Sequence, residues 1–172
     1  MATLAEIILP VWHTANRVTT FLVENLPRDL MTAALPASPR RTIGTLVTHL
    51  HNVRCMWVRT LGEEHGLVPP EKIDRAHVLQ RRQLVAALQR SGRAVGKLLQ
   101  LGCDHGGTIP PSRRYVWRNL QLDVGHVLAY LVAHEAHHRG QIVMAARELG
   151  RSLSAETTEG LWQWRQRERE LR

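Results

Sequence analysis

The chain has 172 residues, of which 44% are apolar, and this favours a single domain with a substantial core. It lacks a run of about 18 uncharged apolar residues, a basic signal-peptide start and a framework of paired cysteines, which argues against a membrane span and favours a cytoplasmic protein. The net charge is +8, but the basic residues are spread along the chain without a recognition-helix motif or zinc finger, so specific nucleic-acid binding is not expected.

The first predicted helix covers about residues 3–25, where apolar side chains recur every three or four positions. Pro10 lies inside this segment, so the helix is expected to begin near it or to be kinked there. Three prolines then interrupt the pattern. A second helix is predicted from Thr42, a suitable N-cap, to Gly62, which is a natural stop.

A third helix is predicted over about residues 75–101, with Val78 among its inward residues. The long loop that follows has room for a short extended piece. The fourth helix is predicted over about residues 121–149, before Gly150. A short C-terminal helix at about 158–171 is expected to dock on the body through Leu161 and Trp162, which are apolar residues in a polar segment.

No segment shows convincing two-residue alternation, so no strand is predicted and the fold class is all-α. The simplest architecture is one domain over residues 1–172, a four-helix bundle with long inter-helix connections of roughly 12 to 20 residues. Long connections can cross the end of a bundle, so consecutive helices need not be antiparallel.

Histidines gather in the stretch HEAHHRGQ, which runs from His134 to Gln141. On a helix, His134 and His138 differ by about 40° and about 6 Å of rise, so their imidazoles share one face and suit a single metal ion. The best third ligand is His49, which falls within the apolar stripe of the second helix. His51 points about 160° away from His49 and is expected to face solvent.

Other polar residues give weaker signals. His126 lies two turns before His134 and is a candidate to line the same cavity. Cys103, Asp104 and His105 are metal-binding residue types, but two glycines follow them and no partner pair is evident, so this stretch is interpreted as a turn.

The spacing of His134, Glu135 and His138 also matches the zinc-protease signature H-E-x-x-H. The longer metzincin form would need glycine at Gln141 and histidine at Met144, and no predicted strand is present to hold a peptide. A protease is therefore disfavoured, and Glu135 is interpreted as a surface carboxylate or as one that supports the ligands.

Three stretches, HLHNVRCMWVRTLG, HEAHHRGQI and LWQW, resemble the DinB family of damage-inducible bacterial proteins, which is related to the YfiT-like metal proteins. The resemblance covers nearly the whole chain. It implies a four-helix bundle, often a homodimer, with a divalent zinc or nickel ion held at the positions of His49, His134 and His138. Characterised relatives include S-transferases that use bacillithiol or mycothiol and a thiol-dependent maleylpyruvate isomerase.

Three neutral imidazoles leave coordination positions open, as in a catalytic metal site. The leading hypothesis is therefore a metal-dependent S-transferase that moves a low-molecular-weight thiol such as bacillithiol onto an electrophile. Gln141 and Asn52 are candidates to orient the ligand histidines, and Arg139 is a candidate to bind a substrate carboxylate. No general base is evident. The alternatives are a non-catalytic metal-binding stress protein, a metal-dependent hydrolase and a DNA-associated protein.

Overall fold

The computed structural model describes residues 1–35, 38–74, 76–77 and 79–171. Within these residues four long helices dominate, which confirms the all-α class: α1 Leu4–Glu24, α2 Ile43–Gly62, α3 Arg81–Asp104 and α4 Val124–Glu148. The smaller elements are the 3-10 turns η1 Arg28–Met31 and η2 Glu63–His65, the strands β1 Ala34–Leu35 and β2 Ser38–Thr42, and the short helices α5 Ala155–Gly160 and α6 Trp164–Arg169.

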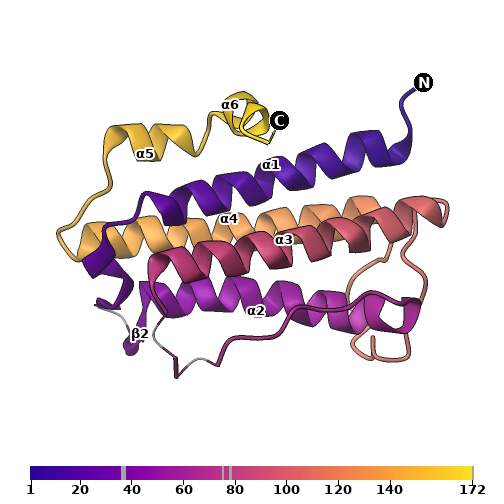
Figure 1. The fold of residues 1–172 in the computed structure, drawn as a ribbon, viewed down its shortest axis with the longest axis horizontal. Coiled ribbons are helices and arrows are strands. Elements are labelled where there is room, and N and C mark those ends of the chain that lie inside the picture. The colour runs from indigo at the N-terminus through magenta and orange to yellow at the C-terminus, as the bar shows by residue number, and fades with distance from the viewer. Residues whose placement is uncertain (36–37, 75, 78, 172) are drawn as a thin grey trace.

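The four long helices lie side by side, with α1 and α4 running in one direction and α2 and α3 in the other (Figure 1). The segment after α2 returns along the length of the bundle before α3 begins, so these two consecutive helices are parallel. This arrangement agrees with the expectation that long connections free neighbouring helices from antiparallel packing. The C-terminal helices cover α1, and α6 packs directly against it.

Helix α1 begins at a capping box in which Thr3 and Glu6 bond each other's backbone N–H groups. Pro10 lies inside the helix on its exposed side, and the helix continues through it from Leu4 to Glu24. The apolar side chains that were expected to face the core on this helix do so only in part. Ile7, for example, remains 56% exposed.

Close packing of α1 on α3 depends on a glycine. The indole Nε1 of Trp12 donates a 2.8 Å hydrogen bond to the carbonyl oxygen of Gly92. A Cβ atom at Gly92 would lie 2.4 Å from the side-chain oxygen of Asn16. Glycine costs about 1 kcal/mol of helix propensity relative to alanine, but here it lets the two backbones approach.

The core consists of two apolar clusters separated by a polar layer. One cluster includes Trp12, Trp57, Leu98 and Leu131, and the other includes Leu22, Leu46, Leu88 and Ile142. Between these positions the four helices contribute buried polar side chains, namely Thr19, Arg54, Ser91 and Glu135. The layer lies at the middle of the bundle, which is also where the candidate histidines of α2 and α4 fall.

Several predicted boundaries are corrected. Helix α3 begins at Arg81, after the capping residue Gln80, and not near residue 75. Arg75 and Val78, which belonged to the predicted third helix, lie outside the described residues. The absence of strands was also wrong, because β1 and β2 pair as a short, irregular antiparallel hairpin before α2.

The C-terminal segment docks differently from the expectation. It forms two short helices instead of one, and Trp162 is 84% exposed. The buried contact is made by Arg167, whose guanidinium lies 3.9 Å from the ring centre of Phe21 on α1. Leu161 is partly buried against the core, as expected. A cation–π contact therefore replaces the predicted tryptophan contact.

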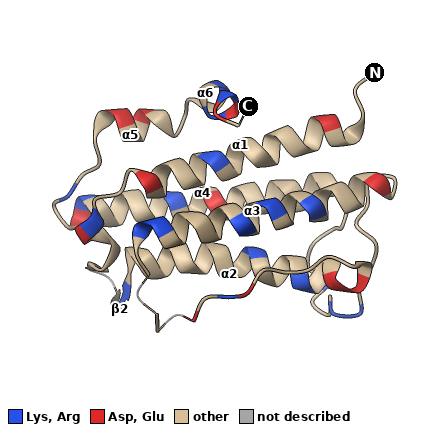
Figure 2. Ribbon diagram, viewed as in Figure 1, with Lys and Arg blue, Asp and Glu red and all other residues tan. Residues whose placement is uncertain are grey.

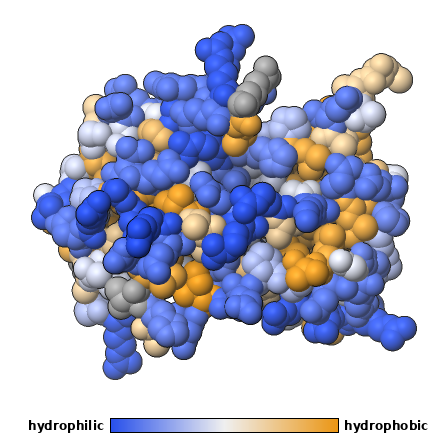
Figure 3. All heavy atoms as spheres, in the orientation of Figure 1, coloured by the Kyte–Doolittle hydropathy of each residue, from blue (hydrophilic) through white to orange (hydrophobic). Residues whose placement is uncertain are grey.

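Charged side chains are distributed over most of the elements (Figure 2). On the face shown in Figure 3, hydrophilic residues predominate and apolar residues form scattered small patches. Within the described ranges, no helix combines the length and apolar character needed to cross a membrane.

Candidate metal centre

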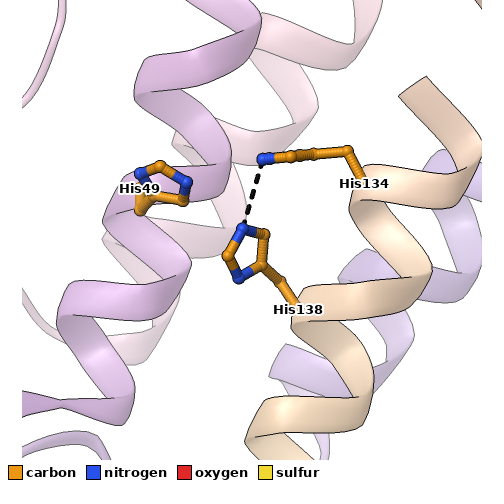
Figure 4. A group of neighbouring side chains, drawn as sticks. All are labelled: His49, His134 and His138. Carbon is orange, nitrogen blue, oxygen red and sulfur yellow. Dashed lines mark hydrogen bonds between the residues drawn. The ribbon is translucent and has the colours of Figure 1, made fainter. Parts of the chain in front are cut away.

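Three histidines from two helices, α2 and α4, point toward one another (Figure 4). His49 comes from the middle of α2, and His134 and His138 come from consecutive turns of α4. Their candidate ligand atoms all lie within 4.8 Å of one another. The structure therefore brings together the three residues that the sequence suggested.

The spacing of the ring nitrogens fits a common metal ion. Ligands about 2.0–2.1 Å from a tetrahedral zinc ion are about 3.3–3.4 Å apart. Nε2 of His134 lies 3.2 Å from Nε2 of His138, close to that value. The ring of His49 has its centre 4.7 Å from that of His138 and 5.5 Å from that of His134, so small side-chain adjustments would complete the set.

The environment keeps His134 and His138 in the neutral state that metal binding requires. His134 is half-buried and His138 is 7% exposed. Burial lowers the pKa of His134, and the charge of His138 lowers it further. Burial also lowers the pKa of His138, although its hydrogen bond with Gln141 opposes this shift.

Gln141 orients one member of the cluster. Its side-chain Oε1 lies 2.7 Å from Nδ1 of His138, so this nitrogen carries the proton and donates it. The lone pair of His138 is then on Nε2, the nitrogen that faces His134. Metal-binding histidines commonly have such a partner on the ring nitrogen away from the metal. The geometry thus matches the role expected for Gln141.

Glu135 is buried, which excludes one of its two interpretations, that of a surface carboxylate. It is 1% exposed and forms a two-pronged ion pair with Arg54, with N···O distances of 2.8 and 2.7 Å. Thr19 donates a further 2.6 Å hydrogen bond to it. Burial opposes ionisation, but the charge of Arg54 and these hydrogen bonds outweigh it, and the pKa of Glu135 is lowered.

Arg139 lies on the same side of α4 as Glu135. Its Nη1 donates a 2.9 Å hydrogen bond to Thr19 of α1. Arg139 is one helical turn after Glu135 and therefore belongs to the buried ion-pair network. Its expected contact with a substrate carboxylate stays a prediction.

His51 is fully buried, which corrects the expectation that it faces solvent. Its Nδ1 lies 3.0 Å from the carbonyl oxygen of Ala87, and its Nε2 lies 2.9 Å from that of Glu71. The helical wheel placed it correctly opposite His49. However, the segment that returns from α2 to α3 covers that side of the helix. The side of α2 that was expected to face solvent is therefore buried.

Asn52 anchors the same returning segment. Its amide group exchanges two 2.8 Å hydrogen bonds with the backbone of Ile73. The amide of Asn52 therefore bonds the segment between α2 and α3. Sequence reasoning had instead placed this amide beside His49. His126 is exposed and bonds Asp123 at the start of α4, so it does not line the histidine cluster.

Neither cysteine is a convincing nucleophile. Burial raises the pKa of Cys55 to about 11, and its sulfur lies against the ring of His51. Burial and the charge of Asp104 raise the pKa of Cys103. Both thiols therefore stay protonated at neutral pH.

The surroundings differ on the two sides of the histidines. Toward the loop before α4, the ring of Tyr130 lies nearly parallel to that of His134 with centres 6.3 Å apart, and Trp57 contacts Tyr130. On the other side is a cavity of about 260 Å³. Residues of the hairpin, α2 and α4 line it: Leu35, Ser38, Arg41, Leu46, Gln141, Met144, Ala145 and Glu148. This cavity could not be predicted from the sequence pattern, because the hairpin that forms one wall of it was not predicted.

The chain was compared with families of known proteins and with curated sequences. The model of the DinB family matches residues 1–170, a range that contains all four long helices and all three clustered histidines. No curated protein matches the chain.

Proposed function

The chain belongs to the DinB family, and we propose that it binds one divalent ion, zinc or nickel, through His49, His134 and His138 to promote transfer of a small thiol to an electrophile. The observation that carries the proposal is the convergence of three imidazole donors within 4.8 Å from two different helices. Such a set resembles the three-ligand sites in which a fourth position stays open for a reactant.

The protein's own residues would prepare the site in two ways. Burial keeps His134 and His138 neutral near pH 7, since their pKa values are lowered. Gln141 accepts the Nδ1 proton of His138 and so directs the other ring nitrogen toward the cluster. A bound divalent ion would supply a Lewis acid that lowers the pKa of a thiol and raises the thiolate fraction at neutral pH.

The charge balance of the site favours an anionic reactant. The three histidines contribute no negative charge when neutral. The nearest buried carboxylate, Glu135, is already paired with Arg54. The positive charge of a divalent ion would thus remain uncompensated by its protein ligands, and a thiolate would offset it.

The nucleophilic sulfur would come from a small molecule, because both cysteines of the chain have raised pKa values. In the proposed transfer, the thiol sulfur bonds to an electrophilic carbon and the thiol proton passes to solvent. With a halide, the carbon–halogen bond breaks and the halide ion departs with the electron pair. With an epoxide, a ring C–O bond breaks and its oxygen keeps the electron pair and takes a proton from solvent. Arg54 and Glu135 would hold α2 and α4 in register without touching the reactants.

A second candidate is a metal-binding protein without catalysis. The observation that favours it is the burial of His138, which is only 7% exposed. A metal used for storage or structure tolerates such limited access, whereas a reaction requires that two substrates reach the ion.

The two candidates are separated by a conjugation assay on zinc- and nickel-loaded protein. Bacillithiol, mycothiol and glutathione would each be offered with a panel of epoxides and activated halides. The proposal predicts a rate that a chelator abolishes, that His138→Ala abolishes, and that His137→Ala retains. Metal binding with no chelator-sensitive rate for any pair would instead support the non-catalytic candidate.

A further inference from the structure

The cavity of about 260 Å³ near the histidines, here called the hairpin cavity, is lined by residues of the hairpin, α2 and α4. Leu46, on its wall, is one helical turn before His49. Gln141, also on its wall, accepts the hydrogen bond from His138. A molecule in this cavity would therefore lie one turn away from the proposed metal ligands.

The hairpin cavity has one positive and one negative side chain on its wall. Arg41 is the next-to-last residue of β2, and Glu148 is the last residue of α4. Among the described residues neither forms an ion pair, and they do not pair with each other. Both charges are exposed enough to meet a ligand from solvent. The other charged residues of the region, such as Arg40 and Arg147, do not line the cavity.

This pattern selects the kind of ligand. An arginine fork matches a carboxylate, and a glutamate accepts hydrogen bonds from an ammonium group. A purely anionic ligand would meet repulsion from Glu148, and a purely cationic one would meet repulsion from Arg41. The remaining wall is mostly apolar, with Leu35, Leu46, Met144 and Ala145, and suits a short hydrocarbon linker.

We propose that the hairpin cavity binds the amino-acid end of a substrate, with Arg41 on its carboxylate and Glu148 on its ammonium group, while the other end of that substrate reaches the histidines. The volume suits a group of amino-acid size better than a whole drug-sized ligand, whose pockets span about 300–1,000 Å³. The placement of the other end of the substrate at the histidines rests on the proposed function. The binding of the amino-acid end in the cavity requires no metal.

The test uses the metal-free, full-length protein and three probes that lack a free thiol. S-methyl-L-cysteine carries both charges, 3-(methylthio)propanoate lacks the ammonium group, and 2-(methylthio)ethylamine lacks the carboxylate. Amide chemical shifts would be followed by NMR during titration. We expect S-methyl-L-cysteine to shift the amides of Leu46, Gln141 and Ala145 and to bind at least about tenfold more tightly than either other probe.

Single substitutions assign each charge. Arg41→Gln should weaken binding of S-methyl-L-cysteine and the propanoate by about tenfold and should not weaken binding of the amine, which loses a repulsive charge. Glu148→Gln should weaken binding of S-methyl-L-cysteine and the amine and should not weaken binding of the propanoate, for the same reason. The matched controls Arg40→Gln and Glu156→Gln should change nothing. The spectra themselves report whether each variant is folded.

Three results would overturn the proposal: equal binding of the three probes, no shift of the cavity amides, or an equal effect of Arg40→Gln and Arg41→Gln. Failure of the proposed function would be seen elsewhere, as absence of metal at the histidines or of a chelator-sensitive rate. The two failures are therefore distinguishable.

Discussion

The neighbouring residues His134 and Glu135 lie on two different faces of α4, and the polar groups on these two faces differ in their partners. Glu135 faces α1 and the core, where Arg54 and Thr19 complete its hydrogen bonds. His134 and His138 lie on the other face, where their ring nitrogens approach each other and His49. On the first face, the charge of Glu135 is neutralised by Arg54 of the same protein. On the second face, the histidine nitrogens converge and could donate their electron pairs to a metal ion. One short motif therefore combines a structural ion pair with a candidate ligand site.

The largest expected effect breaks the buried face. Arg54→Ala should lower the free energy of unfolding by about 3–5 kcal/mol, because Glu135 would remain buried without its cation. Urea denaturation of the metal-free protein would measure this. His137→Ala, at an exposed position of the same helix, should change it by less than about 0.5 kcal/mol. A loss below about 1 kcal/mol for Arg54→Ala would contradict the structural role of the ion pair.

Substitution of a histidine in the cluster should have the opposite pattern, with a large effect on zinc affinity and a smaller effect on stability. His138→Ala should weaken zinc binding by more than about a hundredfold, since it removes a direct ligand and supporting residues alone are worth 10–100-fold. The metal-free variant should lose less unfolding free energy than Arg54→Ala does. Chelator competition would give the affinity, and urea denaturation would give the stability. Unchanged affinity would mean that His138 is not a ligand.

A smaller effect is expected at the residue that orients the ligand. Gln141→Leu should weaken zinc binding by about 10–100-fold, because the Nδ1 proton of His138 loses its acceptor. Met144→Leu, one turn farther along α4, is the control and should leave the affinity unchanged. If both variants bind zinc equally well, Gln141 does not act through His138.

The smallest expected effect is that of pH on zinc affinity near neutrality. His134 and His138 have lowered pKa values, so both are neutral at pH 7 and zinc affinity should be constant between pH 7 and 8. Protons should compete only as the pH falls to these lowered pKa values, which lie below the ordinary histidine value of about 6.5, with up to two protons released by these residues per ion. Affinity that already declines as the pH falls from 8 to 7 would show that the rings are not held neutral.

The same shifts affect stability with a definite sign. In the window between the lowered pKa values and about 6.5, the unfolded chain binds more protons than the folded one. These histidines therefore stabilise the metal-free protein least at acidic pH, and their contribution is fully present above about 6.5. Denaturation of the wild type and of His134→Ala across this window would isolate it.

Much of the fold was readable from local patterns. The four helices follow apolar periodicity, and the Thr42 cap and the end of α4 before Gly150 lie where the sequence placed them. The three histidines were identifiable because helix geometry fixes their faces. Other features depend on distant partners. Arg54 and Glu135 are 81 positions apart, and His51 is buried by a connection that has no periodic pattern. A hairpin as short as β1 and β2 gives little alternation to detect.

If one ion is held between two helices, its binding must depend on His49, because His49 is the single ligand that α2 contributes. Wild-type protein and His49→Ala would be incubated with zinc, desalted and analysed for metal per chain, with circular dichroism as the check of folding. We expect about one ion per wild-type chain and a sharp loss in the folded variant. Full zinc occupancy in folded His49→Ala would contradict it.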